Sequence, residues 1–134
     1  MTDHDHALML FGMSMKDFQA LCGMIDSAQF ADEVFGFHAQ QAVEKALKAW
    51  LSEKNLEYPQ THDLGLLLSL LKESGEKVGG LELLVEYNSF AVQYRYEAMD
   101  LSEEPALDRK AIVESVRALT WKVSKIIKPR ASGP

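Results

Sequence analysis

The placement of proline constrains the fold of this chain most strongly. The four prolines stand at positions 59, 105, 129 and 134, so long stretches without proline lie between them. Proline stops or kinks a helix because it lacks an N–H donor and its ring clashes with the preceding turn. Inside these stretches apolar residues recur at spacings of three and four, as at Phe18, Leu21, Cys22 and Ile25. This spacing predicts amphipathic helices rather than strands.

Five helices are expected, over about residues 14–29, 31–54, 61–74, 81–99 and 106–128. Asn55 ends the second helix, and Thr61 is the expected N-cap of the third, with Asp63 near its positive end. Alternation with a period of two is confined to short ambiguous stretches. We therefore predict an all-α fold, an up-and-down bundle of four to five helices. Residues 1–13 are expected to be a flexible leader, 14–128 a single domain and 129–134 a tail.

The composition is that of one globular domain. The chain has 134 residues, of which 47% are hydrophobic and 25% charged, and this length can bury a core without disulfides or a structural metal. The single Cys22 can form neither an intramolecular disulfide nor a four-ligand zinc site. The longest apolar runs, such as residues 64–71, are too short to cross a bilayer, and the first residues are acidic where a signal peptide is basic. We expect a cytoplasmic protein without a metal or other cofactor.

The charge balance excludes one class of function. The formal net charge is −6 and the pI is about 5.2. A broad nucleic-acid-binding surface needs many cations, because its affinity comes largely from neutralising phosphates. The sequence therefore excludes a broad basic surface and leaves room for a local basic pocket.

The expected helix over 31–54 has two unlike faces. On a helical wheel of about 100° per residue, one arc is apolar and is the predicted core: Phe35, Ala39, Ala42, Val43, Ala46, Ala49 and Trp50. The opposite arc is polar: His38, Gln41, Glu44, Lys45, Lys48 and Ser52. Periodicity alone favours a solvent-exposed polar face, with side-chain pairs Glu44–Lys48 and Gln41–Lys45.

The expected helix over 81–99 carries an arginine in its apolar arc. Arg95 lies there, Asn88 lies beside that arc, and Tyr94 and Tyr96 flank the arginine. A guanidinium on a core-facing stripe is costly unless it is paired or lines a cleft or an interface. Three interpretations stay open: an ion pair with Glu44, a ligand for a phosphate, or a contact with a partner chain.

The histidines favour structural roles when considered one at a time. His38 is expected at the boundary of the polar face, and His62 in the first turn of the third helix, where it caps the helix or covers the preceding loop. His4 and His6 belong to the expected leader. The sequence contains no glycine-rich phosphate loop, His-Glu-x-x-His motif, EF-hand or cysteine–histidine zinc spacing.

Three segments together closely resemble the HEPN family (higher eukaryotes and prokaryotes nucleotide-binding domain). They are Phe37–Leu51 (FHAQQAVEKALKAWL), Thr61–Leu64 (THDL) and Tyr94–Tyr96 (YRY), and the resemblance covers about residues 15–127. It implies a helical bundle of the type found in nucleotidyltransferase substrate-binding subunits, commonly dimeric, with a cleft between the polar stripe of the second helix and Arg95. It also implies a prokaryotic protein encoded beside a minimal nucleotidyltransferase, as a two-component or toxin–antitoxin pair.

The motif of the ribonucleases in that family is incomplete in this chain. Many HEPN proteins are metal-independent ribonucleases with an arginine followed, after four to six residues, by a histidine. Arg95 matches the arginine, but no histidine follows it, and Asp100 stands at the four-residue spacing. The tyrosine that is adenylylated in some pairs is missing as well. A carboxylate is a poor substitute for an imidazole in acid–base catalysis near neutral pH, which weakens the ribonuclease interpretation.

We therefore expect a non-catalytic HEPN protein that binds a nucleotide or nucleic-acid phosphate around Arg95 and acts with a minimal nucleotidyltransferase. Two alternatives stay open: a ribonuclease toxin in which Arg95 acts with Asp100 or His38, and an interaction module that dimerises through the fourth helix. A homodimer is expected. The expected ligand-binding residues are Arg95, Asn88, Tyr94, Tyr96, Gln41, Lys45, Lys48 and His38.

Overall fold

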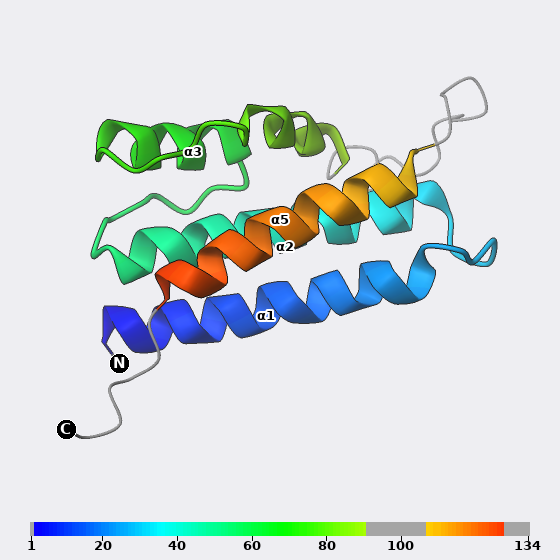
Figure 1. Cartoon of the computed structure of the whole chain (residues 1–134), viewed down its shortest axis with the longest axis horizontal. Coiled ribbons are helices and arrows are strands. Elements are labelled where there is room, and N and C mark those ends of the chain that lie inside the picture. The colour runs from blue at the N-terminus through cyan, green and yellow to red at the C-terminus, as the bar shows by residue number, and fades with distance from the viewer. Residues whose placement is uncertain (1, 91–106, 128–134) are drawn as a thin grey trace.

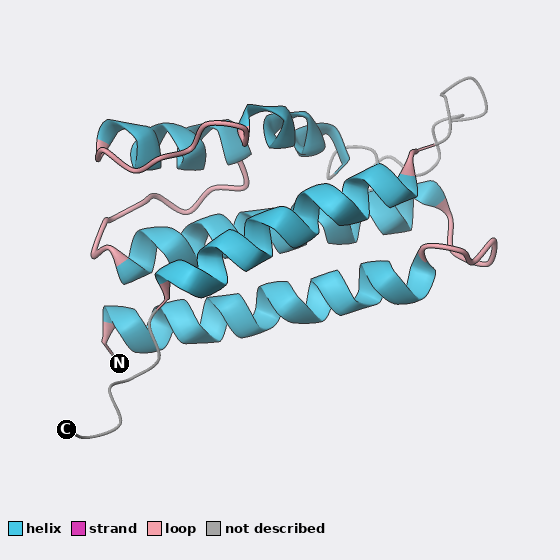
Figure 2. Cartoon of the chain, in the orientation of Figure 1, coloured by secondary structure: helices cyan, strands magenta, loops and turns pink. Residues whose placement is uncertain are grey.

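The computed structural model describes residues 2–90 and 107–127, and these residues are entirely helical apart from their connections (Figures 1 and 2). Three long helices pack against one another: α1 (Asp3–Met24), α2 (Asp32–Glu53) and α5 (Arg109–Ile126). A shorter helix, α3 (Leu64–Glu73), and a 3₁₀ helix, η1 (Glu82–Tyr87), cover α2 from the other side (Figure 1). The predicted all-α class is confirmed. None of the described helices is long and apolar enough to span a membrane.

The expectation of a flexible leader over 1–13 is wrong, because α1 begins at Asp3. The Thr2 hydroxyl accepts a hydrogen bond from the Asp5 amide, and the Asp5 carboxylate accepts one from the Thr2 amide. This capping box satisfies amides that the first turn leaves without helical partners. Ala7 and Leu10 are buried, so the first turns of α1 belong to the core.

The two N-terminal histidines fix the start of α1 against the end of α2 and the loop that follows it. Nδ1 of His4 lies 2.7 Å from Oε1 of Glu53, and Nε2 of His6 lies 3.3 Å from the hydroxyl of Tyr58. The interpretation of His4 and His6 as parts of a disordered terminus is therefore corrected.

The other helix boundaries follow the expectations with local differences. Asn55 has a positive φ of 59° immediately after α2, as a helix-stopping residue does. The N-cap of α3 is Asp63 rather than Thr61, because the Asp63 carboxylate accepts from the amides of Gly65 and Leu66. The segment expected to begin the fourth helix is the 3₁₀ helix η1, and residues 91–106 lie outside the described part.

The predicted core arc of α2 is buried as expected. A hydroxyl–carbonyl hydrogen bond of 2.6 Å joins Ser14 of α1 to Ala42, and it shows how closely the two helices approach. Small side chains at this contact permit that approach. The arc residues are at most 1% exposed: Phe35, Ala39, Ala42, Val43, Ala46, Ala49 and Trp50.

Arg109 ties the start of α5 to the connection between α1 and α2. Its guanidinium lies 3.0 Å from the Asp32 carboxylate and also donates to the backbone carbonyls of Met24, Ser27 and Phe30. One planar group with several fixed donors can satisfy all four acceptors, which the ammonium of a lysine cannot.

Gly36 brings the segment after η1 close to α2. A Cβ atom at Gly36 would lie only 3.0 Å from Cγ of Phe90, so a larger residue would push the two segments apart. Phe90 also stacks on Tyr87, with ring centroids 5.0 Å apart. Phe90 is the last described residue before the stretch that carries Arg95.

Candidate functional site

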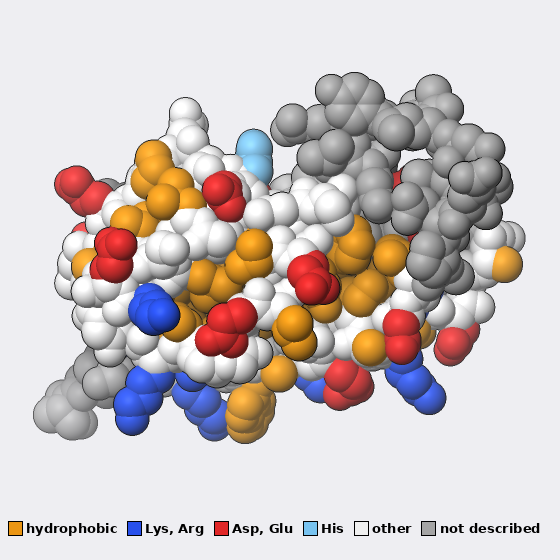
Figure 3. All heavy atoms as spheres, turned by 90° about the horizontal axis from the view of Figure 1, so that it is seen from above, with side chains coloured by type: hydrophobic (Ala, Val, Ile, Leu, Met, Phe, Trp, Pro, Cys, Tyr) orange, Lys and Arg blue, Asp and Glu red, His pale blue; other side chains and the backbone are white. Residues whose placement is uncertain are grey.

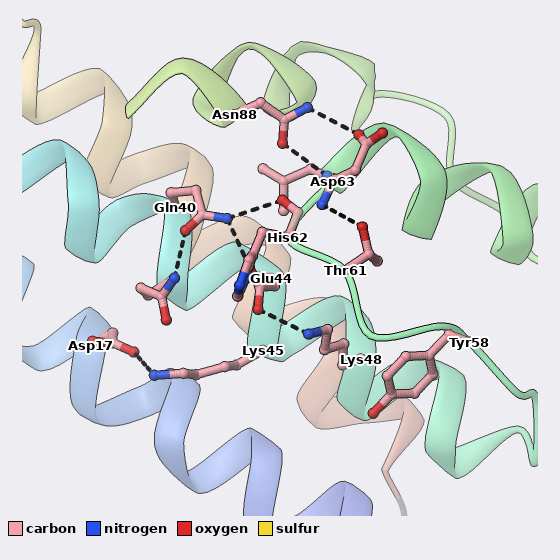
Figure 4. A network of polar contacts seen from close by, with 12 residues as sticks. Asp17, Gln40, Glu44, Lys45, Lys48, Tyr58, Thr61, His62, Asp63 and Asn88 are labelled. Atoms are coloured by element: carbon pink, nitrogen blue, oxygen red, sulfur yellow. Dashed lines mark hydrogen bonds and ion pairs between the residues drawn. The ribbon is translucent and has the colours of Figure 1, made fainter. Parts of the chain in front are cut away.

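The polar arc of α2 is covered rather than solvent-exposed. Glu44 is 4% exposed and Ser52 5%, and the side chains of Lys45 and Lys48 are only 20% and 14% exposed. The connection between α2 and α3 passes over this arc on one side, and α1 packs beside it on the other (Figure 4). The expectation of a solvated face is therefore wrong, because helical periodicity does not show where a connecting loop runs.

Glu44 is the centre of the polar network in Figure 4. Its Oε1 accepts hydrogen bonds from Nε2 of Gln40 and from Nδ1 of His62, both at 2.9 Å. Its Oε2 lies 3.0 Å from Nζ of Lys48. The predicted Glu44–Lys48 pair is thus present, as part of a larger arrangement.

The network holds Glu44 in its ionised form. Burial alone would raise the pKa of this carboxyl, because a low-dielectric environment disfavours the charge. The hydrogen bonds from Gln40, Lys48 and His62 outweigh burial, so the pKa of Glu44 lies below its ordinary value of 4.5. At neutral pH this group is a carboxylate that accepts from all three neighbours.

His62 is held from two directions, although its side chain is 62% exposed. Its Nδ1 contacts Glu44, and its backbone carbonyl accepts from Gln40 at 3.3 Å. His62 precedes α3 instead of lying in its first turn, and Asp63 is the cap. The expectation that His62 covers the preceding loop missed its contact with a buried carboxylate.

Asn88 fixes the start of α3. Its Oδ1 accepts from the Leu64 amide at 2.9 Å, and its Nδ2 donates to Oδ1 of Asp63 at 3.2 Å. Asn88 therefore stands above His62, at the edge of the network (Figure 4).

A second carboxylate, Asp17 of α1, organises the other end of the polar arc. Its two oxygens lie 2.9 Å from Nδ1 of His38 and 2.8 Å from Nζ of Lys45. Lys45 thus pairs with Asp17 instead of forming the expected pair with Gln41, whose Nε2 donates to Oε1 of Gln40 at 2.7 Å. Asp17 lies in the second half of α1.

The structure brings five of the nine predicted site residues into one region. His38, Gln41, Lys45 and Lys48 lie along α2, and Asn88 lies across from them (Figure 4). The other predicted residues fall outside the described ranges: Arg95, Tyr94, Tyr96 and Asp100.

Four residues of this region escaped the sequence-based site prediction: Asp17, Gln40, Glu44 and His62. Three of them, Gln40, Glu44 and His62, lie within the segments that resemble the HEPN family. Among residues 2–90 and 107–127, no group of three or more His, Cys, Asp or Glu side chains is placed to hold a metal ion.

The described residues define an all-helical domain with a network of charged and amide side chains along one face of its central helix. A family model for the HEPN domain matches residues 17–125. The chain belongs to this family. Membership of the HEPN family supports a function related to nucleotides or RNA. No curated protein and no solved structure matched the chain.

Proposed function

We propose that this HEPN protein binds a phosphate group of a nucleotide or of RNA beside the polar arc of α2, and that Arg95 supplies the deciding positive charge. The observation that carries the proposal is the fixed position of two partly buried lysines on one helix face. Lys45 is held by Asp17 and Lys48 by Glu44, at 2.8 and 3.0 Å. Side chains held in place before a ligand arrives lose little entropy when it binds.

The charges explain why a further cation is needed. Each of the two lysines is neutralised by its carboxylate partner, so these four groups contribute no net charge to the region. A bound phosphate can accept hydrogen bonds from polar side chains such as Gln41 and Asn88. Its negative charge also requires a nearby cation that is not already paired. The family resemblance implies that Arg95 faces the polar arc of α2, and we propose Arg95 as this cation, with Tyr94 and Tyr96 as rings on which a base can stack.

Binding of a labelled RNA oligonucleotide or nucleotide by fluorescence anisotropy tests the proposal. We expect wild-type protein to bind and Arg95→Ala to lose at least about tenfold in affinity, since a hydrogen-bonded charge contributes about 1.5–3 kcal/mol. Lys110→Ala is the matched control, because it removes one positive charge from an exposed position on α5. If Arg95→Ala changes only the melting temperature, Arg95 forms a structural ion pair and the proposal fails.

We also propose that the protein acts in the cytoplasm of a prokaryote with a minimal nucleotidyltransferase, as a two-component or toxin–antitoxin pair. The support is membership of the HEPN family together with the resemblance of the THDL and YRY segments. A short nucleotidyltransferase reading frame beside the gene, and co-purification of the two products, would support the pairing. Absence of such a neighbour would leave a binding module that acts alone.

Ribonuclease activity is the second candidate function. The observation that favours it is that two imidazoles are each oriented by a carboxylate, His38 by Asp17 and His62 by Glu44. This is the arrangement in which a histidine serves as a general acid or base. Cleavage of RNA in EDTA by the wild type, lost in Arg95→Ala, would establish this activity, and absence of cleavage between about pH 5 and 9 would exclude it.

A further inference from the structure

His62 presents one of its ring nitrogens outward while the other is fixed. Nδ1 is engaged by the buried Glu44 carboxylate at 2.9 Å, whereas Nε2 has no hydrogen-bond partner among the residues that the structure describes. The imidazole is 62% exposed, although a 6% exposed carboxylate side chain orients it. A tether for the loop requires only the Nδ1 contact, so the exposed Nε2 is free for another role.

We propose that His62, oriented by Glu44, is a pH-dependent phosphate ligand of this protein. In its protonated form Nε2–H donates a hydrogen bond to a phosphate oxygen of the bound nucleotide or RNA. The inference rests on the proposed function and adds to it a residue, a contact atom and a pH dependence.

The fixed tautomer explains why the contact depends on protonation. Because Glu44 is ionised, it accepts the Nδ1 proton and leaves Nε2 of a neutral imidazole as a lone pair. That lone pair repels a phosphate oxygen, which is also an acceptor. Protonation converts Nε2 into a donor and gives the region the positive charge that Lys48, neutralised by Glu44, does not supply.

The charged and titratable groups around His62 come from three elements. Glu44 and Lys48 face it from α2, and Lys48 lies 5.9 Å from the ring centroid of Tyr58 in the loop. Asp63, the next residue, caps α3 and is held by the uncharged Asn88. Imidazole is the side-chain type that gains or loses a charge in the range of about pH 5 to 8.

An asparagine at position 62 separates the tether from the ligand contact. In His62→Asn the side-chain amide occupies about the position of Nδ1 and can still donate to Glu44, but nothing replaces Nε2. The imidazole is exposed, so we expect this variant to fold with a melting temperature close to that of the wild type. His62→Gln, which extends further into solvent, is a second variant that removes the ionisable group.

The experiment is an anisotropy titration of a labelled RNA oligonucleotide between about pH 5.5 and 8, the range in which imidazoles titrate. RNA phosphodiesters do not titrate in this range, so a change in affinity reports on the protein. We expect wild-type affinity to fall about tenfold as pH rises. His62→Asn should bind at every pH as the wild type does at high pH. His62→Gln retains an amide donor near the position of Nε2 but has no ionisable group, so its affinity should not change with pH.

His4→Gln is the matched control, because it breaks another imidazole–carboxylate pair, with Glu53, outside the proposed site. It should keep the pH dependence of the wild type. If both His62 variants also keep it while Arg95→Ala abolishes binding, the inference is overturned and the proposed phosphate site stands. If the wild type binds no RNA or nucleotide at any pH, both are overturned.

Discussion

At the scale of single residues, burial of Glu44 is the feature that most changes the interpretation of the sequence. The Glu44–Lys48 pair follows from a spacing of four on a helix and was predicted. Its burial was not predictable from spacing, since the loop after α2 folds back over Glu44 and brings His62, 18 residues further along the chain, into contact with it. A buried carboxylate is stable only when donors compensate for its lost hydration, and here Gln40, Lys48 and His62 do so.

We predict that Glu44→Gln lowers the free energy of unfolding by about 2 kcal/mol at neutral pH, because it leaves Lys48 partly buried without its counter-charge. The folded-state pKa of Glu44 lies below its unfolded value of 4.5. Its stabilising contribution is therefore fully present above about pH 4.5 and is lost as pH falls through the folded pKa. Urea denaturation across this range should show the difference between wild type and variant shrinking in acid.

Glu114→Gln is the control for that measurement, since the Glu114 side chain is 67% exposed. It should change the free energy of unfolding by less than about 0.5 kcal/mol. A constant difference between Glu44→Gln and wild type from pH 7 to below 4 would contradict the assigned shift.

At the scale of secondary-structure elements, apolar periodicity predicted the core-facing side of α2 and the approximate extents of α2, α3 and α5. Apolar periodicity did not predict the start of α1, because the charged and histidine residues there are typical of a flexible terminus. The local signal was the pairing of Thr2 with Asp5 in a capping box. The 3₁₀ form of η1 was not predictable, because its apolar spacing is also compatible with an α-helix.

Leu10→Ala tests the corrected start of α1. Leu10 is 8% exposed, so its truncation leaves a cavity and should cost about 2–4 kcal/mol of unfolding free energy. The neighbouring Met9 is 45% exposed, and Met9→Ala should cost less than about 1 kcal/mol. Equal effects of the two substitutions in thermal or urea denaturation would indicate that these residues form a leader without core contacts.

At the scale of the whole molecule, the acidic net charge and a local phosphate site are compatible. On the face in Figure 3, acidic side chains are spread widely and basic ones lie mainly along one edge, so that face has no broad basic area in its described part. The charge composition predicted the absence of a broad basic surface. It could not predict that Asp17 and Glu44 neutralise the two lysines of α2, because those pairs depend on how the helices and the loop pack.

We predict a homodimer in solution. The family resemblance implies one, and large apolar side chains remain uncovered in the described part, above all Leu83 at 72% and Trp121 at 65% exposure. Such side chains are common at protein interfaces. Light scattering should give about twice the chain mass of 15.0 kDa, and a monomeric mass at micromolar concentration would contradict the prediction. Arg95→Glu should lower the dimer fraction only if the fourth helix forms the interface.

The central claim is that a local phosphate site depends on Arg95, and RNA binding at several salt concentrations tests it most directly. For a site that contacts one or two phosphates, RNA binding by the wild type should depend only weakly on salt. The slope of log affinity against log salt should be about −1, since each phosphate contact contributes about −0.7 on single strands. Arg95→Ala should remove most of the affinity, and Lys110→Ala should not. Binding that is absent in the wild type, or unchanged by Arg95→Ala, would contradict the account.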